Sequence, residues 1–276
     1  MKKKTWLKFP LALLMAAAAA LPVRAESTPW ADPCIPAPHD YTYQDDTRFV
    51  AVNRVTQPGL TYLVADVQLR DVYGFHVAVS EQGAQTLSSM AEGTGAVLAV
   101  NGDDFGSHRY GVIIRNGEVL RAHDTTRHML ILEEDGSMRT LTDRTAQTPV
   151  DLAGQLVSEN VWHTFEFGPE LVRDGQLSDF PRAFDVISTR SSRKEPRTAI
   201  GMIAPLHYVV IVVDGRQPGY SEGISLQDLQ QLFLDYGAQT ALNLDGGGSA
   251  EMWFMGEIIS SPSGGHERAI SDILYF

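Results

Sequence analysis

Short runs of apolar and β-branched residues dominate the chain from about residue 49 onward, and Gly, Asn and Asp interrupt them. This texture is typical of β-strands, because an amphipathic helix would instead place apolar residues every three or four positions. Asn116-Gly117 and Asp135-Gly136 predict tight hairpin turns between such runs, and Asp174-Gly175 predicts a further turn. The runs expected to form strands are residues 49–56, 60–69, 75–79, 96–100, 111–114 and 129–132.

Three segments have helical character: residues 86–92, 150–159 and, most clearly, 225–236. In the last of these, Ser225 and Asp228 can cap the first turn, and Gly237 can supply the left-handed residue that ends the helix. Near-continuous apolar runs at 208–213 and 240–244 flank it and predict strands covered on both faces. The pattern therefore predicts an α+β fold, with a mostly antiparallel or mixed β-sheet core, a few helices and one strand–helix–strand crossover in a single domain.

Composition and charge narrow the classes of protein. A chain of 276 residues that is 43% hydrophobic can bury a full core without disulfides or a structural metal. The 34 acidic and 22 basic residues give a net charge of −12, which argues against a nucleic-acid partner. The single cysteine, Cys34, excludes an intrachain disulfide and any multi-cysteine zinc or iron–sulfur site.

The first 25 residues have the pattern of a secretory signal peptide. Four lysines precede a thirteen-residue apolar run, and Val23-Arg24-Ala25 offers small residues before a cleavage site after Ala25. The alternative is an uncleaved anchor, although the run is short for a spanning helix. We expect export by the general secretory route to the periplasm or the extracellular space, an extended lead-in over residues 26–48 and one domain over 49–276. No later segment is long and apolar enough to span a membrane.

Two glycine-containing segments follow predicted strands and carry carboxylates. In residues 243–249, Asp245 stands at a strand end beside Gly246, Gly247 and Gly248, whose backbone can approach a ligand closely. In residues 101–104, two adjacent carboxylates follow Asn101-Gly102 and repel one another unless a cation or hydrogen bonds compensate them. Each segment can also be read as an ordinary polar turn.

Arginines stand at two further strand ends. Arg197 opens a β run after a polar loop, and Asp214-Gly215-Arg216 ends another. A guanidinium can hold a phosphate through two parallel hydrogen bonds, although a surface arginine more often pairs with an acid.

In their order along the chain, these segments resemble the phosphodiester glycosidase family. The resemblance covers roughly residues 90–276, with one departure at Asp104, where an aromatic residue is usual in the family. The matching segments are 99–103, 111–117, 167–169, 172–175, 196–201, 213–216 and 242–249, followed by Pro262 and Arg268.

The resemblance implies hydrolysis between the anomeric carbon of a sugar and a phosphodiester, as in an N-acetylglucosamine-1-phosphodiester, on an envelope or extracellular glycan. A phosphate monoester leaves readily, so the site needs mainly charge stabilisation and a carboxylate. The expected catalytic residues are Asp245, as base or nucleophile, with Asp103 and Asp214. The expected substrate-binding residues are Asn101, Gly102, Arg115, Arg197, Thr198, Arg216, Gly246, Gly247, Ser249 and Arg268.

Two other functions fit the same residues. One is a non-catalytic module that binds phosphorylated glycans. The other is a metal-dependent envelope hydrolase that uses Asp103, Asp104 and Asp245 on calcium or magnesium. No cofactor is certain from the sequence, and a divalent cation is a possible one.

Overall fold

The computed structural model describes residues 29–80, 83–106, 108–143, 146–179 and 191–276, so the expected signal peptide lies outside the described residues. Its largest element is an eight-stranded sheet in the order β1-β2-β3-β14-β13-β15-β11-β12. The bounds are β1 Tyr41–Gln44, β2 Arg48–Gln57, β3 Leu60–Leu69, β11 Glu170–Arg173, β12 Gln176–Leu177, β13 Arg197–Ala204, β14 His207–Val213 and β15 Thr240–Asn243. Part of the segment expected as a lead-in thus forms β1, at one edge of this sheet.

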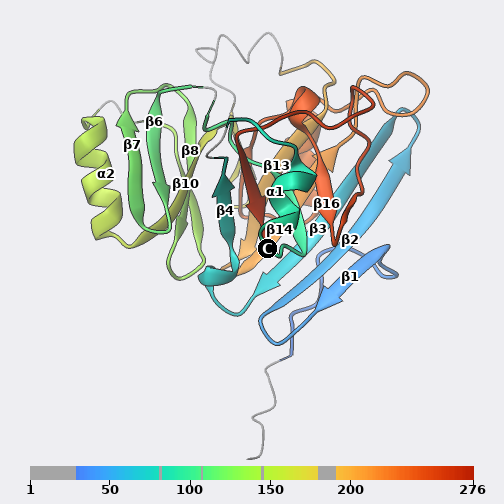
Figure 1. Cartoon of the computed structure of the whole chain (residues 1–276), viewed down its shortest axis with the longest axis horizontal. Helices are drawn as coiled ribbons and strands as arrows, with labels where there is room; N and C mark the ends of the chain where they lie inside the picture. The colour runs from blue at the N-terminus through green and yellow to red at the C-terminus, as the bar shows by residue number, and fades with distance from the viewer. Residues whose placement is uncertain (1–28, 81–82, 107, 144–145, 180–190) are drawn as a thin grey trace, which may run out of the picture.

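A second sheet of five strands covers one face of the large sheet (Figure 1). Val50, Val212, Val100 and Leu274 belong to one apolar core that fills the space between the two sheets. The short helix α1 (Leu87–Glu92) packs on the second sheet and contacts β5, β16 and β18. This sheet has the order β17-β16-β5-β18-β4, with bounds Glu257–Ile258, Met252–Phe254, Leu98–Asn101, Asp272–Tyr275 and His76–Val79.

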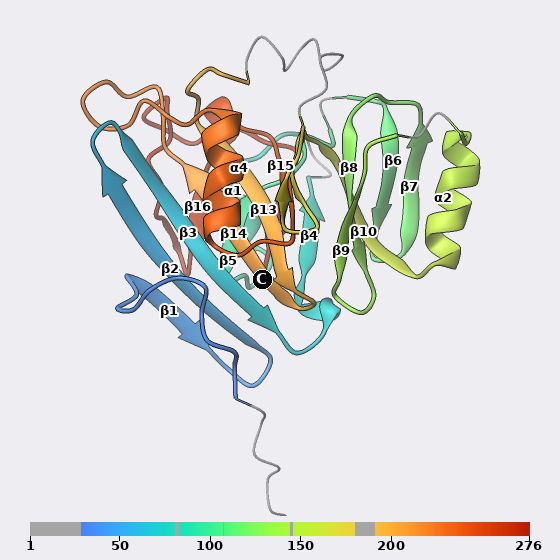
Figure 2. The ribbon, with the colours of Figure 1, turned by 180° about the vertical axis from the view of Figure 1, so that it is seen from behind.

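The opposite face of the large sheet carries helix α4 (Leu226–Asp235), which Figure 2 shows lying across the strands. Leu226, Leu229 and Phe233 pack into a second core with Ile211 and Ala241 of the sheet. The predicted crossover β14–α4–β15 is confirmed, with one addition. Strand β13 lies between β14 and β15 and is antiparallel to both, so all strand pairs among the described residues are antiparallel.

A smaller lobe holds β10-β8-β9, the hairpin β6–β7 and helix α2 (Pro149–Ser158). The three-stranded sheet is joined to the hairpin through a side chain of β10. The hydroxyl of Thr164 accepts the Ile114 amide of β6 at 2.8 Å and donates to the Val112 carbonyl of β6 at 2.7 Å. The bounds are β6 Gly111–Arg115, β7 Glu118–His123, β8 His128–Glu133, β9 Met138–Leu141 and β10 Val161–Phe167.

The predicted fold class is confirmed. The Ser225 hydroxyl accepts the Asp228 amide at 3.1 Å, and Gly237 has φ +83° where α4 ends, as the sequence predicts. Asn116-Gly117 links β6 to β7 with both residues at positive φ. In the part of the chain that the structure describes, we find no helix with the length and apolar character needed to cross a membrane.

Candidate active site

A cavity of about 250 Å³ opens where the end of β5, the loop after β15 and the segment before β18 meet. Residues 80, 83–84, 106, 249 and 269–271 also contribute to it. Gly102 lines it as well, and the charged and amide side chains of the lining are those of Asn101, Asp104, Asp245, Arg268 and Asp272.

Backbone and side-chain hydrogen bonds bring three of the sequence-predicted segments together at this place. The amide of Leu244 donates to the Thr198 carbonyl at 2.8 Å, and the Thr198 hydroxyl donates to Asn101 Oδ1 at 2.6 Å. Asn101 Nδ2 donates in turn to the Asp245 carbonyl at 2.7 Å. Asn101 and Thr198 are fully buried, so they set the position of the Asp245 backbone.

The carboxyl of Asp245 faces the cavity from a partly buried position. Burial raises its pKa, and the charge of Asp104 raises it further. A hydrogen bond from Ser249, the Gly246 amide and the positive charge of Arg268 all lower it. A cavity-lining carboxyl with a raised pKa is a candidate for acid–base or nucleophilic chemistry, and Asp245 meets both conditions.

Arg268 is the guanidinium that shares the cavity with Asp245. Arg197, one of the expected substrate-binding residues, has its backbone beside the glycine loop. A Cβ on Gly246 would lie 3.4 Å from the Arg197 Cα. Its Nη2 donates to the Arg193 carbonyl at 3.4 Å, and the side chain is not part of the cavity lining.

Arg216 lies over the glycine loop, where its Nη2 would be 3.1 Å from a Cβ on Gly247. Its exposed side chain binds Glu195 through a 2.6 Å hydrogen bond from Nε. The Gly247 amide donates to the Pro196 carbonyl at 2.9 Å, so this predicted donor is used within the chain.

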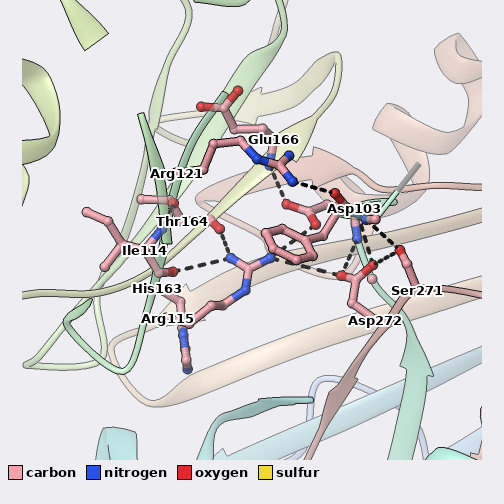
Figure 3. A network of polar contacts seen from close by, with 12 residues as sticks. Asp103, Ile114, Arg115, Arg121, His163, Thr164, Glu166, Ser271 and Asp272 are labelled. Carbon is pink, nitrogen blue, oxygen red and sulfur yellow. Dashed lines mark hydrogen bonds and ion pairs between the residues drawn. The ribbon is translucent and has the colours of Figure 1, made fainter. Parts of the chain in front are cut away.

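Asp103 and Arg115 form a buried ion pair beneath the cavity, which Figure 3 shows in detail. Arg115 Nη2 lies 3.1 Å from Asp103 Oδ1, and Asp103 Oδ2 accepts the Glu166 amide at 2.7 Å. Both side chains are almost fully excluded from solvent, and neither contributes to the cavity lining.

Asp272 connects this network to the cavity, and sequence reasoning missed it. Its carboxylate accepts the amides of Asp103 and Phe105 at 3.0 and 3.1 Å, and Arg115 Nη2 lies 4.0 Å away. Burial and the neighbouring Asp103 charge raise its pKa. A Cβ on Gly102 would stand 1.9 Å from Asp272 Oδ2, so this close approach requires glycine at position 102.

Asp214 lies at the end of β14 and serves another part of the molecule. Its Oδ1 accepts the Ser261 amide at 2.8 Å and its Oδ2 accepts the Tyr220 hydroxyl at 2.8 Å. Burial raises its pKa, while Arg54, at 3.9 Å, opposes that rise. Asp214 thus joins two loops and is not brought to the cavity that holds Asp245.

Glu251, which the sequence analysis also did not predict, holds the backbone of Arg268, a lining residue of the cavity. Its Oε1 accepts the backbone amide of Arg268 at 3.0 Å, and its own amide donates to Asn101 Oδ1 at 3.3 Å. The side chain is fully buried, and burial raises its pKa from 4.5 to about 7. An acid two residues after a glycine-rich loop is the only sequence signal that could have indicated it.

Glu251 should make folding stability depend on pH near neutrality. Because its folded pKa exceeds its unfolded pKa, its contribution is complete below about pH 4.5 and is lost as the pH rises through about 7. The loss is expected to reach about 3 kcal/mol. Glu251→Gln should remove this part of the pH dependence in urea unfolding measured from pH 4.5 to 8. Glu118→Gln, on the exposed part of β7, is the control and should leave the slope unchanged. An unchanged slope in Glu251→Gln would contradict the assignment.

Comparison with known proteins shows the family to which the chain belongs. Residues 94–276 match the family described as phosphodiester glycosidase. The prophage-derived uncharacterized protein YomE of Bacillus subtilis strain 168 is 32% identical over 197 residues, which cover 69% of this chain and 29% of that protein. The chain thus matches less than a third of the length of this relative.

Two solved structures share the fold. One is the zebrafish N-acetylglucosamine-1-phosphodiester alpha-N-acetylglucosaminidase catalytic domain, auto-inhibited by its pro-peptide, with a TM-score of 0.65 and 19% identity over 83% of this chain and 82% of that chain. The other is a hypothetical protein from Synechocystis, with a TM-score of 0.66 and 14% identity over 87% and 64%. The family match spans residues 101–104, 245–249 and 268–272, the segments that carry the acids and the arginine of the cavity. With the resemblance seen in the sequence thus confirmed, the chain belongs to the phosphodiester glycosidase family.

Proposed function

We propose that this protein is an exported hydrolase that cleaves the bond between a sugar anomeric carbon and a phosphodiester oxygen. The products would be a free sugar and a phosphate monoester. The observation that carries the proposal is the cavity in which Asp245 and Arg268 face the same space, in a chain of the phosphodiester glycosidase family. The zebrafish enzyme with this fold acts, by its name, on an N-acetylglucosamine-1-phosphodiester.

The chemistry follows from the two charges. Arg268 stands at the exposed rim, where a phosphodiester can enter and where positive charge stabilises the departing phosphate. Asp245 lies deeper, beside the Ser249 hydroxyl, and acts on the anomeric centre as nucleophile or as base toward water. Cleavage adds water across the C–O bond, so the sugar gains a hydroxyl and the phosphate oxygen gains a proton.

Incubation with a panel of sugar-1-phosphodiesters tests the proposal. Release of reducing sugar together with phosphate monoester supports it. Release of sugar-1-phosphate instead would place the cleavage on the other side of the phosphorus and contradict it. Binding without turnover would favour the non-catalytic glycan-binding module.

The same assay in the presence of a chelator tests the metal-dependent alternative. Among the described residues, the group of three His, Cys, Asp or Glu side chains whose ligand atoms lie within 4.8 Å of one another does not include Asp103, Asp104 or Asp245. We therefore expect sugar release to continue in EDTA, and loss of activity that calcium or magnesium restores would support the metal-dependent hydrolase.

Arg268→Ala should lower kcat/KM for sugar release by about 10²–10³-fold, because the guanidinium stabilises charge that develops on the leaving phosphate. Arg139→Ala is the matched control, since Arg139 pairs with Glu133 and Glu159 in the smaller lobe. Steady-state kinetics on the best substrate of the panel measures both. Equal activity of the two variants would remove Arg268 from the mechanism.

The location of the protein is part of the same proposal. The lysine-rich start and the apolar run before Ala25 support export by the general secretory route. N-terminal sequencing of the protein recovered outside the cytoplasm should give a sequence that begins at Glu26.

A further inference from the structure

Three side chains of metal-binding type meet on the face of the large sheet that carries α4. Asp66 lies in β3 and His207 begins the neighbouring strand β14. Cys34 belongs to the segment that precedes β1 and packs against the apolar core on this face. Asp66 is 32 positions from Cys34 and 141 positions from His207, so the fold, and not local sequence, brings the three together.

Their potential ligand atoms lie within 4.8 Å of one another. His207 Nε2 is 2.7 Å from Asp66 Oδ2, and the Cys34 amide donates to the same oxygen at 2.7 Å. Asp66 is fully buried, His207 is 8% exposed and Cys34 is half-buried. An ion at this place would therefore be bound by two buried side chains and one half-buried side chain.

The cluster is braced by a second layer of hydrogen bonds. Gln68 Nε2 donates to Asp66 Oδ1 at 3.0 Å and to the Ala31 carbonyl at 3.1 Å, while Gln68 Oε1 accepts the Ala31 amide at 2.8 Å. The carboxylate and the main chain that carries the cysteine are therefore oriented by the same side chain. Such outer contacts are typical of metal sites, where they fix the ligands before the ion binds.

From this geometry we propose that Cys34, Asp66 and His207 bind one divalent transition-metal ion, with Zn²⁺ the best match. One thiolate, one carboxylate and one neutral imidazole balance the two positive charges, so the ion enters the protein without leaving a net buried charge. Sulfur and nitrogen ligands select zinc-like ions over calcium and magnesium, which require oxygen. Binding displaces the thiol proton to solvent and forms the metal–sulfur bond, while the proton between His207 Nε2 and Asp66 Oδ2 leaves that contact for solvent or for His207 Nδ1, and water completes a tetrahedral shell.

This site is separate from the proposed catalytic cavity. The cavity is formed by the end of β5, the segment before β18 and the loop after β15, and Cys34, Asp66 and His207 are not among its lining residues. The bound ion would fasten the segment around Cys34 to β3 and β14, and its binding energy would add to folding stability. The inference therefore does not rest on the proposed function, and either can fail without the other.

Titration of the untagged, chelator-stripped and reduced protein with Co²⁺ tests the inference. We expect one equivalent to bind with the absorption of a cobalt–thiolate bond, and Zn²⁺ to displace it. Cys34→Ser and His207→Gln should each weaken binding by at least about 100-fold, and Gln68→Ala by about 10–100-fold. His123→Gln, exposed on β7, is the control and should bind as the unmodified protein does.

A second readout is the melting temperature, which Zn²⁺ should raise in the unmodified protein and in His123→Gln but not in Cys34→Ser. Absence of the cobalt–thiolate band with correctly folded protein would overturn the inference. So would unchanged stoichiometric binding in both Cys34→Ser and His207→Gln. Circular dichroism of each variant before metal addition separates loss of binding from loss of fold.

Discussion

Asp245→Asn is expected to lower kcat for release of sugar from a sugar-1-phosphodiester by about 10²–10⁴-fold, the contribution usual for a positioned acid–base group. Asparagine keeps the shape of the side chain but cannot act as nucleophile or base. The backbone bonds that place residue 245, to Asn101 and to Gly102, do not involve the carboxylate and should persist. Steady-state kinetics gives the loss, and the melting temperature should stay close to that of the unmodified protein.

Two comparisons make the result specific. Asp235→Asn, exposed at the end of α4, should leave kcat unchanged. Asp104→Asn should move the acidic limb of the kcat/KM profile to lower pH, because the charge of Asp104 raises the pKa of Asp245. If the limb stays in place, or if Asp245→Asn keeps full activity, Asp245 does not have the proposed role.

The sequence predicts the elements of this fold well because its signals are local. The cap at Ser225, the stop at Gly237 and the Asn116-Gly117 turn each act over three or four residues, and all are present in the structure. The order of the strands in the large sheet is not predicted by such local signals. That β13 lies between β14 and β15 depends on contacts between strands far apart in sequence, which periodicity does not encode.

The sequence likewise predicts some residues of the candidate site and not others. Asn101, Thr198 and Asp245 are all among the residues that the family resemblance predicts for the site, and hydrogen bonds bring them together in the structure. Which arginine faces the carboxylate could not be predicted, because strand register and loop path decide whether Arg197 or Arg268 points into the cavity. The burial of each acid, from which we argue whether it acts in catalysis or supports the structure, is likewise set by the tertiary fold.

The buried ion pair of Asp103 and Arg115 is expected to matter for stability. Arg115→Met is expected to lower the free energy of unfolding by about 3–5 kcal/mol, since it leaves the charge of fully buried Asp103 without its partner. The guanidinium also donates to the carbonyls of Ile114 and Thr164, which would lose a donor. Urea unfolding followed by circular dichroism measures the change. The half-exposed control Arg139→Met should cost no more than about 1 kcal/mol.

The double variant Asp103→Asn with Arg115→Met decides what the pair does. Removing both charges ends the cost of an unpaired buried carboxylate, so the double variant should be more stable than Arg115→Met alone. The side-chain carbonyl introduced by Asp103→Asn would still be able to accept the Glu166 amide that the carboxylate accepts now. Since Asp103 holds Asp272 beside Gly102 through its backbone amide, the cavity should keep its shape and much of its activity. A double variant that is stable but inactive would show that Asp103 or Arg115 acts directly on the substrate, and the supporting role argued from the burial of the pair would be wrong.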